Sequence, residues 1–107
     1  MSGNKYNGWT NYETWNFKLW MDNDGSDQYW EERAEEIWQG TDEDDKDRSY
    51  DATKQLEDEL EASAYENCPE TSGLYGDVLN ASIREVNWRE IAEHIMADAE
   101  LEGYEAA

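Results

Sequence analysis

The residues of this chain that could perform nucleophilic or metal chemistry are few. Cys68 is the single cysteine and His94 the single histidine among 107 residues. A cysteine nucleophile needs a base beside it, and His94 is the only imidazole that could serve. Because Cys68 precedes Pro69 at an expected helix end and His94 falls on a polar flank, we expect a half-buried thiol and an exposed histidine instead of a catalytic pair. One cysteine and one histidine cannot supply the usual ligands of zinc.

One stretch resembles the start of a calcium-binding loop. Asp22, Asp24 and Ser26 fit positions 1, 3 and 5 of the EF-hand pattern. Position 6 requires glycine and is Asp27, and position 12 requires glutamate and is Arg33. The pattern fails at both diagnostic positions, so the sequence predicts no specific metal site, and loose binding of divalent cations by Asp42, Asp44 and Asp47 stays open.

Carboxylates dominate the remaining chemistry. The chain has 28 acidic and 8 basic side chains, which give a net charge of −20. Carboxylate pairs are so frequent that a pair alone does not indicate a glycosidase, which needs two carboxylates at a fixed separation in a cleft. No glycine-rich phosphate motif is present, the basic residues do not cluster, and the charge repels nucleic acid and anionic membranes. We therefore expect a protein that is not an enzyme, uses no cofactor and binds a basic protein.

The elements that carry these side chains are expected to be α-helices. The apolar residues recur at helical spacing in five stretches, which predict helices over about 11–22, 26–39, 50–66, 74–86 and 88–99. Thr10 with Glu13 forms a capping-box pattern before the first helix, and Asn87 is the expected N-cap of the last. The apolar and aromatic side chains spread so widely around the first helix that we expect it at the centre of the core.

The predicted fold class is all-α, a small single-domain bundle of four to five helices with an N-terminal arm. We expect one acidic helical domain over 1–107, an arm at 1–9 and a frayed tail at 100–107. Trp15, Trp30 and Trp88 fall on predicted core faces. Trp9, in the arm, is the best candidate for an exposed aromatic contact, because exposed tryptophan is enriched at interface hot spots.

Negative charge is concentrated in the middle of the chain. Residues 22–66 hold 18 acidic and 4 basic side chains and thus 14 of the 20 net negative charges. Carboxylates at i and i+4 lie about 6 Å apart along a helix. A globule about 33 Å across with this net charge has one charge per about 1.7 Å, as duplex DNA has along its axis. The candidate binding residues are Glu31, Glu32, Glu35, Glu36, Asp42, Glu43, Asp44, Asp45, Asp47, Glu57, Asp58 and Glu61.

These observations predict a DNA mimic that occupies the positively charged groove of a nucleic-acid-binding protein. Carboxylates can replace phosphates in bidentate contacts with arginine. An alternative is adaptation to a salty cytoplasm, in which surface carboxylates keep a protein hydrated. That interpretation also fits a chain with only four lysines. A homodimer stays open, and the single cysteine together with the polar segment before Asn11 favours a cytoplasmic location.

Two stretches carry a resemblance. The segment Trp9-Thr10-Asn11-Tyr12-Glu13-Thr14-Trp15-Asn16 resembles the opening of a group of small proteins from phages, plasmids and prokaryotic genomes, and Asn87-Trp88-Arg89-Glu90-Ile91-Ala92 is similar to their closing helix. The resemblance implies a mobile-element setting and no activity for any residue. Small acidic proteins from this setting often inhibit host defence proteins such as CRISPR effectors and restriction enzymes. By analogy of class and charge alone, we expect this chain to inhibit such a protein.

Overall fold

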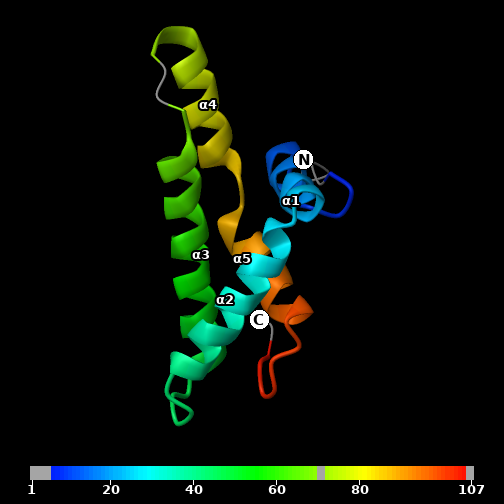
Figure 1. The fold of residues 1–107 in the computed structure, drawn as a ribbon, viewed down its shortest axis with the longest axis vertical. Coiled ribbons are helices and arrows are strands. Elements are labelled where there is room, and N and C mark those ends of the chain that lie inside the picture. Colours follow the sequence, from blue (N-terminus) through cyan, green and yellow to red (C-terminus); the bar gives the residue numbers. More distant parts are fainter. Residues whose placement is uncertain (1–5, 70–71, 106–107) are drawn as a thin grey trace.

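The chain folds into five α-helices. The computed structural model describes residues 6–69 and 72–105. The helices are α1 (Tyr12–Asp24), α2 (Ser26–Gly40), α3 (Arg48–Asn67), α4 (Gly73–Glu85) and α5 (Trp88–Asp98). The all-α prediction is confirmed. In Figure 1, α3 and α4 form a tall pair on one side, α1 lies on the other side, and α2 and α5 lie between them.

The molecule is longer than a compact chain of this length. Its principal extents are 48 × 33 × 25 Å and its radius of gyration is 14.8 Å, against about 13 Å expected. Figure 1 shows the reason, because α4 and the end of α3 project beyond the other three helices. α4 contacts only α1 and α3 among the described residues, so much of its surface faces solvent.

α5 is the central helix. It contacts α1, α2 and α3. Its residues Ile91, Ala92, Ile95 and Met96 are almost completely buried, together with Leu56 and Leu60 of α3. Burying one such large aliphatic side chain stabilises a fold by about 1.5–3 kcal/mol, and this cluster therefore contributes much of the driving force for folding.

The prediction that the first helix is central was wrong. α1 buries Thr14, Lys18 and Met21, whereas Tyr12 is 50% and Trp20 63% exposed. The aromatic side chains occupy so many directions around α1 that they define no single apolar stripe. The buried face is instead selected by hydrogen bonding, since Thr14 is bound to the start of α5.

The N-cap of α1 is Asn11 and not Thr10. The Oδ1 atom of Asn11 accepts from the Thr14 backbone N–H at 2.9 Å and from the Thr14 hydroxyl at 2.6 Å. Thr10 instead donates its backbone N–H to Glu90 Oε1 at 2.8 Å. In the predicted capping box, the Glu13 side chain would accept from the Thr10 N–H. In the structure Glu90, 80 positions away, accepts from it instead.

The predicted cap of the last helix is confirmed, and it is joined to the first. The Oδ1 atom of Asn87 accepts from the Glu90 N–H at 3.1 Å, and the Asn87 N–H donates to Thr14 Oγ1 at 2.8 Å. The Asn87 side-chain amide also donates to Thr10 Oγ1 at 2.9 Å. We call Thr10, Asn11, Thr14, Asn87 and Glu90 the cap cluster. Its members all come from the two stretches that carry the resemblance.

The described part of the N-terminal arm is a tight turn. Tyr6 and Trp9 exchange two backbone hydrogen bonds of 2.7 and 2.8 Å around Asn7 and Gly8. Asn7 and Gly8 have φ values of 48° and 88°, the left-handed geometry that an Asn-Gly hairpin turn requires. The Tyr6 ring packs against Trp15 of α1, which holds the turn on the helix. Residues 1–5 of the predicted arm lie outside the described residues.

The C-terminal segment packs on the bundle, where the sequence predicted fraying. The Trp38 indole N–H donates to the Glu102 carbonyl at 3.1 Å, and the hydroxyls of Tyr104 and Thr53 are 2.8 Å apart. The Glu105 N–H donates to Ser49 Oγ at 2.9 Å. Aromatic packing of Tyr104 on the buried Trp38 overrides the polar composition of this segment. Residues 106–107 lie outside the described residues.

Candidate functional site

The predicted acidic residues lie mostly on one supersecondary unit, the hairpin of α2 and α3. The two helices pack side by side, and α5 contacts both of them from the inner side. The side turned away from α5 is open to solvent (Figure 1). We call the members of the predicted set that are exposed on this unit the acidic face. They are Glu32, Glu35, Glu36, Asp42, Glu43, Asp44, Asp47 and Asp58.

The loop between the two helices is ordered by its own carboxylates. Asp42 Oδ1 accepts from the Asp44 N–H and Asp45 Oδ1 accepts from the Asp47 N–H, both at 2.9 Å. Asp45 is only half-exposed and its carboxyl faces that of Asp51. A hydrogen bond between them lowers the pKa of Asp45 and raises the pKa of Asp51. The loop therefore holds its charges in fixed positions.

Besides the half-exposed Asp45, three predicted residues lie off the acidic face. Glu57 accepts from Arg89 Nε of α5 at 3.2 Å, and Glu61, one turn further on, lies along the same side of α3. Glu31 is half-buried on the opposite edge of the hairpin. Burial raises the pKa of Glu31, and the charges of Asp98 and Asp27 add to the effect.

The basic side chains of the hairpin are largely engaged within it. Arg33 binds Glu59 and Glu36, and Lys54 binds Asp58 at 3.0 Å. Arg48 donates to the Trp38 carbonyl at 2.8 Å and places its guanidinium 3.8 Å from the centre of the Trp38 ring. These cations hold the hairpin together and leave most carboxylates of the acidic face without a cationic partner in the described residues.

The overall charge density is lower than the sequence suggested. The 20 net negative charges along the 48 Å axis are one per about 2.4 Å, against one per about 1.7 Å for duplex DNA. The difference arises because the molecule is elongated by α4 and the end of α3. The molecule as a whole therefore has a lower linear charge density than DNA. Only the hairpin, in which the charge is concentrated, could reach a DNA-like density.

The residues singled out for nucleophilic or metal chemistry are engaged elsewhere. His94 is exposed and stacks on the half-buried Trp9 with ring centres 4.1 Å apart. The Cys68 thiol lies 3.8 Å from the Pro69 carbonyl. Within residues 6–69 and 72–105, no three His, Cys, Asp or Glu side chains gather as metal ligands would.

No described helix has the length and apolar character to span a membrane.

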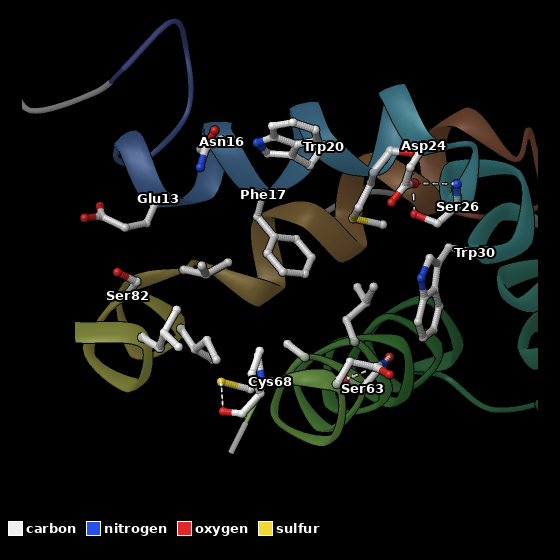
Figure 2. Close-up of a pocket in the computed structure, with 18 of the residues that line it drawn as sticks. Glu13, Asn16, Phe17, Trp20, Asp24, Ser26, Trp30, Ser63, Cys68 and Ser82 are labelled. Carbon is white, nitrogen blue, oxygen red and sulfur yellow. Dashed lines mark hydrogen bonds between the residues drawn. The ribbon is translucent and has the colours of Figure 1, made fainter. Parts of the chain in front are cut away.

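A second surface feature was not predicted from the sequence. α1, the C-terminal half of α3 and α4 enclose a groove of about 600 Å³. Figure 2 shows Phe17 and Trp20 of α1 above it, Trp30 of α2 at one end, and Ser63 and Cys68 below. Leu60, Leu79, Ile83 and Val86 belong to its apolar lining. We call this space the α1–α4 groove.

The apolar surface continues from the groove onto α4. Leu74 is 70%, Tyr75 73% and Val78 52% exposed, which is unusual for side chains of this size. The only buried residue of α4 is Gly76. The sequence held a signal for this surface, since α4 has apolar side chains around much of its circumference. The residue pattern of a single helix does not show whether another helix covers its apolar side.

The tryptophan left open to solvent differs from the one expected. Trp9 was the candidate for an aromatic contact, but it is half-buried against His94 and the core. Trp20 is 63% exposed and lies at the rim of the α1–α4 groove (Figure 2). Trp20 is therefore the tryptophan that the fold presents for contact.

Comparison with known proteins adds one match. No curated protein and no solved structure matches the chain significantly. A protein family matches residues 2–102, a range that includes the cap cluster, the acidic face and the α1–α4 groove. This chain therefore belongs to the family described as "Family of unknown function (DUF7249)".

Proposed function

We propose that this protein binds the cationic nucleic-acid-binding surface of another protein and so excludes nucleic acid from it. The observation that carries the proposal is the acidic face. Its carboxylates are exposed on two packed helices and an ordered loop, while Arg33, Arg48 and Lys54 are used in contacts within the same hairpin. A partner therefore meets a surface of exposed negative charge carried by two packed helices and the loop between them.

The physical basis is replacement of phosphates by carboxylates. Lysine and arginine side chains in a nucleic-acid groove bind phosphates largely through electrostatics. Carboxylates can take the same bidentate contacts with arginine. A net charge of −20 also steers a cationic partner toward the protein and raises the association rate at low salt.

The target class follows from the resemblance of the two motif stretches to proteins of mobile elements. We propose a host defence protein, such as a CRISPR effector or a restriction enzyme, in the cytoplasm of the host cell. The acidic face supports this proposal, because it offers a cationic groove a surface of exposed carboxylates.

The test is competition between this protein and DNA for candidate effectors at low salt. Glu32, Glu35 and Asp44 are exposed and make no ion pair among the described residues, so their reversal to lysine should leave the fold intact. A matched triple reversal at Glu66, Asp77 and Glu102, which lie away from the acidic face, changes the net charge equally. We expect the first variant to lose competition by about tenfold or more and the second to retain most of it. Equal losses in both, or no competition by the natural protein against any effector, would refute the proposal.

A further inference from the structure

The α1–α4 groove is an apolar binding surface without an occupant from the described chain. Phe17 and Trp20 line it from α1 (Figure 2). Leu79 and Ile83 line it from α4. A space of about 600 Å³ falls within the range of ligand pockets. Its lining comes mostly from α1, α3 and α4, with Ser26 and Trp30 of α2. Because the backbone groups within these helices are hydrogen-bonded to one another, the groove offers a partner mainly side-chain contacts.

The groove is extended by a stripe along α4. Tyr75, Leu79 and Ile83 are spaced four residues apart and therefore lie on one side of the helix. Tyr75 is 73% and Leu79 36% exposed. Apolar side chains in a row match an elongated apolar partner, and an amphipathic helix is such a partner, since it anchors itself at i, i+3, i+4 and i+7.

The charges at the groove are negative. Glu13 and Asp24 are its only ionisable carboxylates, and no lysine or arginine is among its described lining residues. The two residues lie at opposite ends of α1, 11 positions or about 16 Å apart along the helix axis. Figure 2 shows them at the two sides of the groove. An occupant with cationic side chains about three turns apart could contact both.

We propose that the α1–α4 groove binds an amphipathic, basic helix of the partner protein. Its apolar side enters between Trp20 and Leu79, and its lysine or arginine residues lie against Glu13 and Asp24. This inference rests on the proposed function, because it names a second contact with the same cationic partner. Charge argues for such a helix over a second copy of this chain, since a copy brings a further net charge of −20 to the interface.

The probe is a synthetic peptide of about 18 residues, or roughly five helical turns, with leucine at i, i+3, i+4 and i+7 and lysine elsewhere. A control peptide has the same composition in an order that gives no apolar side. Because both peptides have the same charge, nonspecific attraction to the acidic face is equal for the two. We expect the amphipathic peptide to bind about tenfold more tightly in calorimetry at physiological salt. Equal affinities would overturn the inference.

Cys68 reports on the groove directly. It is the single cysteine, it is half-buried, and it lines the α1–α4 groove. The amphipathic peptide should slow the reaction of this thiol with a disulfide reagent, and the control peptide should leave the rate almost unchanged. Tight binding of the amphipathic peptide without protection of Cys68 would place the peptide elsewhere and contradict the inference.

Two variants of α4 separate the groove from general effects on the helix. Leu79→Gln changes a groove residue, whereas Val78→Gln changes a neighbour that is 52% exposed and does not line the groove. We expect L79Q to lose the preference for the amphipathic peptide and V78Q to retain it, with equal helix content by circular dichroism. A dimer that L79Q abolishes, with no peptide preference in the natural protein, would assign the groove to a second copy and overturn the inference.

The acidic-face variant keeps the two proposals apart. Reversal of Glu32, Glu35 and Asp44 should reduce competition with DNA while preserving the preference for the amphipathic peptide and the protection of Cys68. If the preference and the protection are absent but competition with DNA is intact, the groove inference fails and the proposed function survives. If they are present but no effector is displaced from DNA, the proposed function fails on its own.

Discussion

Arg33 of α2 and Glu59 of α3 are joined by two parallel hydrogen bonds, from Nε to Oε1 at 2.7 Å and from Nη2 to Oε2 at 2.8 Å. Their side chains are 32% and 31% exposed, so the pair is partly shielded from water. It connects the two helices that present the acidic face, as does the hydrogen bond from Arg48 of α3 to the Trp38 carbonyl of α2. The same guanidinium also binds Glu36, which ties one residue of that face in place.

Replacing Arg33 should therefore weaken the hairpin. We expect Arg33→Gln to lower the free energy of unfolding by up to about 1 kcal/mol, the upper range for a partly exposed ion pair. Lys54→Gln is the matched control, because the exposed Lys54–Asp58 pair lies within one helix. Urea denaturation at neutral pH measures both. Equal losses in the two variants would show that the interhelical pair has no special role.

The effect of Arg33 should depend on pH. The hydrogen bond from Arg33 lowers the pKa of the Glu59 carboxyl below its ordinary value of 4.5. A carboxyl whose pKa is lower in the folded state stabilises the fold above that ordinary value and loses this contribution as the pH falls through the folded-state pKa. The stability difference between the natural protein and R33Q should be largest at neutral pH and shrink in acid. A difference independent of pH would contradict this.

Glu31 should show the opposite sign. Burial raises its pKa above 4.5, and Asp98 and Asp27 add repulsion. The charged form therefore opposes folding above the folded-state pKa, and the penalty is relieved as the pH falls. We expect Glu31→Gln to raise the melting temperature at neutral pH and to leave it unchanged in acid. Glu32→Gln, on an exposed neighbouring position, is the control and should change it less.

The cap cluster should be sensitive to a change that preserves shape. Thr14 is completely buried, and its hydroxyl accepts from the Asn87 N–H and donates to Asn11. Thr14→Val removes both hydrogen bonds and should destabilise the protein by about 1–3 kcal/mol, the range for a buried polar group left without a partner. Thr14→Ser keeps the hydroxyl and should cost less. A valine variant as stable as the serine variant would show that the hydroxyl is dispensable.

Salt distinguishes the two interpretations of the charge. Screening reduces the self-repulsion of a chain with net charge −20, so the melting temperature should rise with salt in either case. The DNA-mimic proposal expects a cooperative transition in dilute buffer at about 0.1 M salt. A protein that is unfolded in dilute buffer and folds only near molar salt would instead favour salt adaptation.

The sequence predicted the elements better than their arrangement. The start of α5 could be foreseen because Asn87 caps its own helix, a local interaction between residues three positions apart. The bond from the Asn11 side chain to the Thr14 N–H is equally local, but Thr10 and Asn11 both have side chains suited to an N-cap. The long-range bond from the Thr10 N–H to Glu90, which the sequence does not show, takes the place of the capping-box bond expected from Glu13. The role of Trp38 in holding the C-terminal segment depends equally on a contact across 64 residues.

The candidate surfaces divide in the same way. The exposure of Glu32 and Glu36 follows from helical spacing opposite Ala34 and is visible in the sequence. Glu57 binds an arginine of α5, whereas Glu59 binds an arginine of α2. The periodicity of α3 does not show which neighbouring helix supplies a partner to either residue. The α1–α4 groove was missed for the same reason, because it exists only between helices.

The hydrogen bond between Thr10 and Glu90 has a consequence for biosynthesis. A nascent chain that has reached residue 85 has neither Asn87 nor Glu90, so the partners that orient Thr10 and Thr14 do not yet exist. α5, which contacts α1, α2 and α3, is also translated after all three of them. Stable folding must therefore wait until the chain through α5 has left the ribosome, and a truncation before α5 should yield a chain without a native core.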